Sequence, residues 1–398
     1  MTDGRITFHP LSFVPEGADV VVGRGDTGTY AVLPHDGAEL LRRLIGGSTA
    51  AEAATWYERN FGEAVDVDDF LGSLADLGFV TSPGSAVIGA VAAPRFQWLG
   101  RALFSAPAWI VYAAVVALAL IELAGRPDLR PAASHVYFTA SLVTVQVVLL
   151  FGTIPLSFLH EAYHVLAGQR LGLHSRLGIS NRYNFVVFET KNNGLLSVRR
   201  GQRYLPFVAG MLIDVVLASA LTLAAAPLVG GGAAAAYTGR LCLALSFSIV
   251  ARLAWQLLLH LRTDLYYVLS TALNCYDLHD ASRSILANRF RRLAGRTAGL
   301  VDETQWTDRD RRVGSWYGWF IALGFAGTVV LAVVFTGPIA VTYAVRAFQG
   351  VLAGTGTWHF WDSLISLAIL AVQFLLPAVL AWRKRRHNRA RQPRLRAS

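Results

Sequence analysis

The sequence predicts a mostly helical, polytopic membrane protein with about six transmembrane helices and a small N-terminal α+β domain. Hydrophobic residues make up 54% of the 398 residues and the mean hydropathy is +0.43, which is typical of integral membrane proteins. Charged residues are frequent in residues 1–90 and rare in the long apolar segments that follow. Basic residues gather in alternate connections between those segments, as expected for a chain that crosses a membrane repeatedly.

The N-terminal region combines strand patterns with helix patterns. Alternating apolar residues predict strands in RITFHP, ADVVVGRG and TYAVLP, with a turn at DTGT before the last of them. Three short helices are expected next, in DGAELLRRLIGG, STAAEAATWYERNFG and DVDDFLGSLADLGFV. Thr49 and Glu52 form a capping-box pattern at the start of the second helix. A hairpin followed by three helices predicts a winged-helix-like domain.

The chain then becomes a linker and a membrane domain. The Pro/Gly/Ala-rich stretch SPGSAVIGAVAAP leads into the linker. We expect these parts: the N-terminal domain 1–85, the linker 86–104, the membrane domain 105–382 and a basic tail 383–398. Six apolar segments are each long enough to cross a hydrocarbon core of about 30 Å: 105–125, 135–168, 205–228, 239–262, 316–345 and 362–382.

The distribution of charge predicts the orientation of the chain. The N-terminal stretch MTDGRITFHPLSF has no apolar core of a signal peptide, which favours a cytosolic N-terminus. Basic residues are dense in 170–203, in 283–312 and in the tail, so these parts are expected on the cytosolic side. We therefore expect a multi-pass protein of a bacterial-type inner membrane, in contact with the lipid bilayer and with both termini in the cytosol. Alternation in LGISNRYNFVVFETKNNG predicts a short strand or hairpin at the cytosolic face, and the alternative is a basic interfacial loop.

The stretch FLHEAYHVLAGQ places two histidines and a glutamate in a predicted membrane helix. His160 and His164 are four residues apart, so both imidazoles project from one face of the helix. HExxH on a helix is the pattern of zinc proteases, in which the glutamate, here Glu161, acts as general base. Such polar groups are costly inside a membrane unless they have a function. The pattern predicts a zinc site, and the alternative is a pair of histidines that only pack between helices.

A catalytic zinc site needs a third protein ligand and keeps one position open for water. The residues offer three candidates: Asp214 in AGMLIDVVLA, and His260 and Asp264 in LLLHLRTDLYYVLSTALNCYDL. Depth in the membrane favours Asp214, whereas Asp264 needs a re-entrant turn to reach the histidines. The ordinary alternatives are a helix N-cap for Asp264 and an interhelical hydrogen bond for Asp214.

Residues 150–280 resemble the site-2 protease family of intramembrane zinc metalloproteases, in particular the branch that acts on peptides in bacterial peptide-maturation clusters. The resemblance rests on HEAYH and on TDLYYVLSTALNCYDL, which is similar to the aspartate motif of the family. It implies that Asp264 is the third zinc ligand and that Asp214 lines the site or serves as an alternative ligand. Leu265 stands where the family has glycine, and Met211 stands where it has proline.

Residues 1–85 resemble the PqqD-like recognition element of pathways that make ribosomally synthesised, post-translationally modified peptides. The stretches LLRRLIGGSTAAE and FLGSLADLGFV carry this resemblance. It implies that the domain binds the leader of a precursor peptide as an added strand. A winged helix can also bind DNA, but acidic residues outnumber basic ones in this region, so no nucleic-acid partner is expected.

Together the resemblances imply a zinc metalloendopeptidase that cleaves a peptide, in particular the leader of a modified precursor peptide. One alternative is a regulated intramembrane protease that cuts a membrane signalling protein. Another is a non-proteolytic peptide exporter or immunity protein that has kept a zinc site. The N-terminal domain favours the first function over the signalling protease, and the intact Glu161 argues against a metal site without catalysis.

Overall fold

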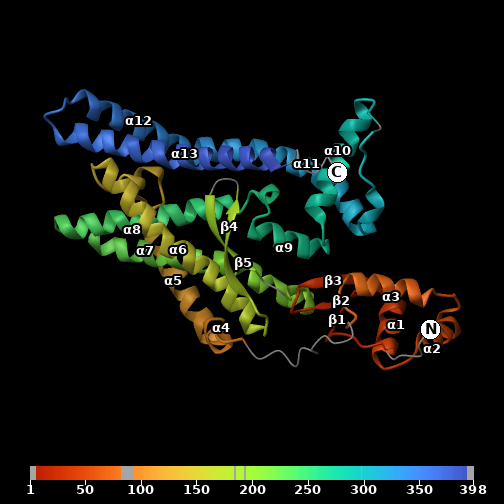
Figure 1. Cartoon of the computed structure of the whole chain (residues 1–398). Helices are drawn as coiled ribbons and strands as arrows, with labels where there is room; N and C mark the ends of the chain where they lie inside the picture. The colour runs from red at the N-terminus through yellow and green to blue at the C-terminus, as the bar shows by residue number, and fades with distance from the viewer. Residues whose placement is uncertain (1–5, 82–93, 183–184, 192–193, 297, 392–398) are drawn as a thin grey trace. The chain divides into compact units, whose positions relative to one another are not determined.

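The computed structural model describes residues 6–81, 94–182, 185–191, 194–296 and 298–391 (Figure 1). The predicted fold class is confirmed, because long apolar helices dominate and a small sheet with short helices lies at the N-terminus. The chain divides into two compact units. One unit contains Met1–Ser105, Tyr163–Leu177 and Thr190–Phe207, and the other contains Ala106–Ala162, Gly178–Glu189 and Val208–Ser398.

The N-terminal sheet has three antiparallel strands in the order β1-β2-β3. Its strands are β1 (Ser12–Glu16), β2 (Asp19–Arg24) and β3 (Thr29–Pro34). The prediction of a first strand in RITFHP was wrong: of its described residues, Phe8 forms an isolated bridge to Val80. The reason is the turn at Gly17, where φ is 71°. This conformation suits glycine, and it pairs β2 with the residues just before the turn.

Three helices follow the sheet, as predicted: α1 (His35–Ile45), α2 (Ala50–Phe61) and α3 (Val67–Asp76). The capping box of α2 is confirmed. Thr49 Oγ1 accepts a hydrogen bond from the backbone N–H of Glu52, and Glu52 Oε2 accepts one from the N–H of Thr49 at 2.9 Å. The helices bury apolar side chains against β2, and this core contains Val20, Val22, Ala38, Leu41, Leu74 and Phe79.

A helix, α4 (Gln97–Leu103), lies in the region predicted as linker, of which residues 86–93 are outside the described part of the chain. Gly100 lets α4 approach the end of α6 (Leu142–Arg170) closely. A Cβ atom at Gly100 would lie 2.3 Å from the carbonyl oxygen of Leu166, so a larger residue cannot occupy this position without a shift of the backbone.

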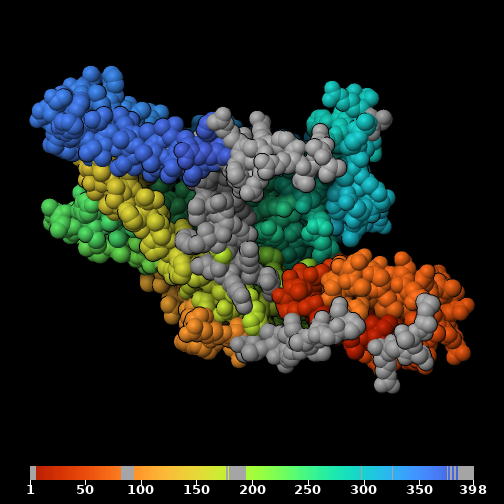
Figure 2. All heavy atoms as spheres, viewed as in Figure 1, coloured from red at the N-terminus to blue at the C-terminus, as the bar shows by residue number. Residues whose placement is uncertain are grey.

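In the part of the chain that the structure describes, five helical runs are long and apolar enough to cross a membrane, and they overlap the first five predicted segments. They are α5 (Ala106–Gly125), α6, α7 (Arg200–Leu228), α8 (Ala233–Trp255) and the continuous run Asp308–Leu352. That run comprises α11 (Asp308–Leu331), a π-helical turn (Ala332–Thr336) and α12 (Gly337–Leu352). The sixth predicted segment lies within α13 (Trp358–Arg391), which packs along α12 (Figure 1 and Figure 2). The chain is therefore built as a multi-pass membrane protein.

Helix α8 ends at Trp255, before the end of the predicted segment 239–262. A short 3₁₀ turn, η4 (Leu259–Leu261), leads to Arg262, whose φ is 55°, and α9 (Asp264–Leu273) begins with Thr263 as its N-cap. This turn brings Thr263 and Asp264 back to Gln256 at the end of α8. Beyond it, α10 (Leu278–Leu293) packs on α11. The predicted strand pair is also present, as β4 (Arg176–Arg182) and β5 (Phe185–Lys191).

Candidate metal centre

The structure brings three of the predicted site residues together. His160 and His164 lie one turn apart on α6, and Asp264 is the first residue of α9. One ligand atom from each of the three residues lies within 4.8 Å of the others. The two histidines are buried, with 5% and 4% of their surface exposed. The separation of His160 Nε2 from Asp264 Oδ2 is 3.2 Å. This group is compact enough to hold a metal ion.

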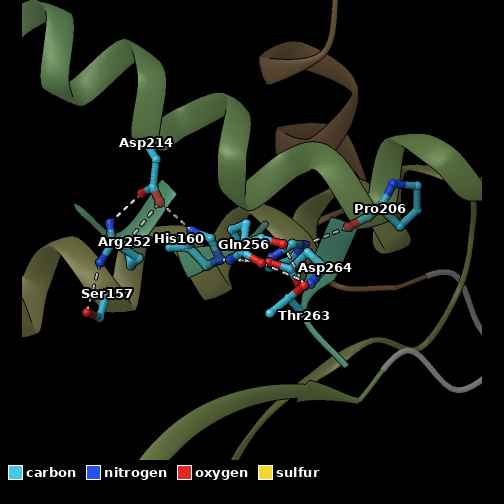
Figure 3. A network of polar contacts seen from close by, with 9 residues as sticks. Ser157, His160, Pro206, Asp214, Arg252, Gln256, Thr263 and Asp264 are labelled. Atoms are coloured by element: carbon cyan, nitrogen blue, oxygen red, sulfur yellow. Dashed lines mark hydrogen bonds and ion pairs between the residues drawn. The ribbon is translucent and has the colours of Figure 1, made fainter. Parts of the chain in front are cut away.

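The other ring nitrogen of each histidine already has a partner, and Figure 3 shows the partner of His160. His160 Nδ1 lies 2.9 Å from Asp214 Oδ2, and His164 Nδ1 lies 2.6 Å from the carbonyl oxygen of Pro206. Both partners are acceptors, so a neutral imidazole at either position would carry its proton on Nδ1 and donate it to that partner. Its Nε2 atom would then keep a lone pair for a metal ion. Metal-binding histidines are oriented in this way in proteins generally.

Asp214 contacts the Nδ1 atom of His160 and lies outside the group of His160, His164 and Asp264. It lies on α7 and its side chain has no exposed surface. Arg252 of α8 holds both of its carboxylate oxygens, with Nε 2.9 Å from Oδ2 and Nη2 bonded to Oδ1. Arg252 also donates to Ser157 Oγ at 3.0 Å. A buried carboxylate needs such a partner, and a bidentate arginine pair is the strongest kind.

Asp264 is fixed by Gln256, the residue at the C-terminal end of α8 (Figure 3). The amide Nε2 of Gln256 donates to Asp264 Oδ2 at 3.0 Å, and its Oε1 accepts from the backbone N–H of Asp264 at 3.0 Å. Thr263 Oγ1 in turn donates to the backbone carbonyl of Gln256 at 2.8 Å. These bonds tie the start of α9 to the end of α8, so both the backbone and the carboxylate of Asp264 are held by Gln256.

Two further candidates lie at other positions. Glu161 follows His160 on α6 and is partly exposed, whereas both histidines are buried. Successive side chains on a helix point about 100° apart, so Glu161 flanks the imidazole face. His260 lies in η4 and its Nε2 is 3.1 Å from Thr328 Oγ1, outside the three-residue group.

Sequence reasoning missed Arg252, Gln256 and Pro206. The available indication was a polar side chain at the end of an apolar segment, SFSIVARLAWQLLL, because a charge there needs a buried partner. The sequence does not say which partner that is. Pro206 contributes a backbone carbonyl, for which the sequence offers no indication.

Electrostatics and donor chemistry together define what the group can bind. Asp214 is neutralised by Arg252, so its charge is already satisfied. The Asp264 carboxylate accepts one neutral hydrogen bond from the Gln256 amide, and its Oδ2 lies 3.2 Å from His160 Nε2. Two nitrogen donors and one carboxylate oxygen suit a first-row divalent cation.

The chain was compared with family models, curated proteins and solved structures, and nothing matches in any of the three comparisons. The functional conclusion therefore rests on the residues of the site.

Proposed function

We propose that this protein is an integral membrane zinc metalloendopeptidase whose metal ligands are His160, His164 and Asp264. The convergence of one ligand atom from each of these three residues, with the Nδ1 atoms of both histidines beside acceptors, carries the proposal. Three protein ligands are the number found in catalytic zinc sites, whereas structural sites have four. The donor set also agrees with the HExxH pattern on α6.

Zn²⁺ in such a site supplies Lewis acidity and lowers the pKa of water to about 7. Glu161 accepts a proton from the attacking water and returns it to the nitrogen of the leaving amine, so that one peptide bond is hydrolysed. Asp214 keeps the proton of His160 on Nδ1 and fixes the orientation of the ring. Gln256 orients the carboxylate of Asp264 in the same way.

The proposed substrate is the leader region of a ribosomally made, post-translationally modified precursor peptide. The N-terminal sheet ends in β3, an edge strand in the order β1-β2-β3, and an extended peptide pairs with an edge of this kind. Excess acidic residues in the domain argue against nucleic acid as its partner. The proposed setting is a bacterial-type inner membrane with both termini in the cytosol, on the basis of the basic connections.

The test uses the full-length protein in detergent with zinc and a precursor peptide encoded by a neighbouring gene. We expect one cut in the peptide by mass spectrometry, and inhibition of this cut by excess leader segment that lacks the cut site. Cleavage that the leader does not inhibit would contradict recognition of the leader. A preference for the transmembrane segment of a signalling protein would instead support regulated intramembrane proteolysis, and binding without any cleavage would support a transport or immunity role.

A further inference from the structure

A buried ion pair joins the N-terminal sheet to the first turns of α7. Glu16 is the last residue of β1, and its Oε1 accepts a hydrogen bond from Arg203 Nη1 at 2.9 Å. The two side chains are 5% and 4% exposed. Arg203 also donates through Nε to the carbonyl of Val198 at 3.0 Å and through Nη2 to that of Leu196 at 3.2 Å. The guanidinium thus holds three separate acceptors.

The segment before α7 is held against the same sheet. Its short 3₁₀ turn, η3 (Leu195–Ser197), packs on β1 and β2, and Leu195 is buried. Gly194, which precedes the turn, has a φ of 91°, a conformation that glycine adopts without strain. The sheet, η3 and Arg203 therefore fix the path by which the chain enters α7.

Pro206 lies three residues beyond Arg203 on α7, about 4.5 Å along the helix axis at 1.5 Å per residue. Its carbonyl oxygen is the acceptor that holds the Nδ1–H of His164. The part of α7 that Arg203 fixes is therefore the part that determines the direction of the His164 ring. A displacement of this turn would move the acceptor and allow the imidazole to rotate.

We propose that Glu16 and Arg203 are positioning residues of the metal centre, so that the N-terminal domain helps to form the metal site through α7. The inference rests on the proposed function in one respect, that His164 is a metal ligand. Loss of the Glu16 carboxylate leaves a buried guanidinium without its anionic partner, which strongly favours rearrangement of Arg203. The domain then has a role at the metal site in addition to peptide recognition.

The experiment measures the zinc affinity of the full-length protein by competition with a chelator. The variants are Glu16→Gln, Arg203→Gln and the double variant. Residues that orient a ligand typically contribute 10–100-fold to metal affinity, so we expect each single variant to bind zinc about tenfold more weakly. The double variant is expected to bind zinc no more weakly than the single variant with the lower zinc affinity, because both changes break the same ion pair. Arg203→Lys keeps the charge beside Glu16 and is expected to lie closer to the wild type than Arg203→Gln.

The matched control is Asp26→Asn. Asp26 pairs with Arg24, which is 9% exposed and also donates to the carbonyl of Gly78. Among the hydrogen bonds and ion pairs of the described residues, this pair makes none to α7, so it stabilises the same domain independently of that helix. The zinc affinity of Asp26→Asn should equal that of the wild type. An equal loss in this control would show that only the stability of the domain matters, and would overturn the proposal.

Failure of the coupling is distinguishable from failure of the metal assignment. The wild type and His164→Ala are measured in the same series. If the wild type binds zinc and His164→Ala does not, but Glu16→Gln and Arg203→Gln retain wild-type affinity, the coupling is wrong and the metal site stands. If His164→Ala retains full affinity, the metal assignment itself is wrong. Hydrogen exchange of the domain identifies any variant that unfolds. In that case the zinc affinities of Arg203→Lys and Arg203→Gln are compared, and equal affinities in the two variants would contradict the coupling.

Discussion

Asp214 Oδ2 lies 2.9 Å from His160 Nδ1, while Asp264 Oδ2 lies 3.2 Å from Nε2 of the same ring. One imidazole therefore connects two aspartates that have different environments. Asp214 is fully buried and paired with Arg252, whereas the Asp264 side chain is 26% exposed and receives an amide hydrogen bond. This difference favours Asp264 as the ligand and Asp214 as the residue that orients His160.

The first prediction separates the two aspartates by substitution with asparagine. Asp264→Asn removes an anionic ligand, so we expect the purified protein to lose its zinc. Asp214→Asn keeps an oxygen that accepts the His160 proton but loses the charge pair with Arg252, and a reduction of about 10–100-fold in zinc affinity is expected. Metal content after dialysis and the Kd from chelator competition test this. Release of zinc by Asp214→Asn alone would reverse the two assignments.

The second prediction concerns the general base. Glu161→Gln keeps the shape of the side chain but removes its basicity, so zinc content and helix content should be unchanged. Peptide cleavage is expected to fall about 10²–10⁴-fold. The matched control is Glu122→Gln on α5, which alters a carboxylate in another apolar helix and should leave cleavage intact. An active Glu161→Gln protein would point to a different base or to a function without proteolysis.

The local part of this site could be predicted from the sequence, and the distant part could not. His160, Glu161 and His164 belong to one helix, so their spacing alone places them together. Asp264 comes from a turn that depends on the positive φ of Arg262, and depth in the membrane alone favoured Asp214. The resemblance to a protease family, rather than the residue pattern, singled out Asp264.

The same distinction holds for the fold. Apolar length predicted α5 to α8, and the capping box at Thr49 and Glu52 predicted the start of α2, because both features are local. The first strand was misplaced because strand pairing depends on the turn at Gly17 and not on the alternation of residues before it. Contacts such as Glu16 with Arg203 join residues far apart in the chain and have no sequence pattern.

The third prediction concerns Gln256, which forms two hydrogen bonds with Asp264. Gln256→Met has a similar length but neither donor nor acceptor, so both hydrogen bonds between this residue and Asp264 are lost and the carboxylate is held less firmly. Zinc affinity is expected to fall at least tenfold by analogy with other residues that orient metal ligands. Gln305→Met is the control, because Gln305 bonds only to the carbonyl of Asp302 among the contacts described for its side chain. Equal zinc affinity in Gln256→Met and the wild type would show that Asp264 needs no support.

The fourth prediction concerns the stability of the N-terminal domain as the pH changes. Tyr57 of α2 donates its hydroxyl proton to the carboxylate of Asp36 in α1. This hydrogen bond lowers the pKa of Asp36 below its ordinary value and raises the pKa of Tyr57 to about 12. A carboxylate with a lowered pKa stabilises the folded domain above its unfolded pKa of about 3.9, and the contribution disappears as the pH falls through the folded-state pKa.

Tyr57→Phe should therefore destabilise the domain by about 1 kcal/mol at neutral pH, the usual net contribution of one hydrogen bond. The difference from the wild type should shrink as the pH falls below about 4, where the unfolded carboxyl group also binds a proton. Hydrogen exchange of α1 and α2, measured in the full-length protein from pH 7 down to pH 3, reports the local stability directly. The ring centroids of Tyr57 and Phe61 lie 4.9 Å apart, so Tyr57 also packs against its neighbours. A stability difference that stays constant over this pH range would mean that Tyr57 acts through this packing and not through the charge of Asp36.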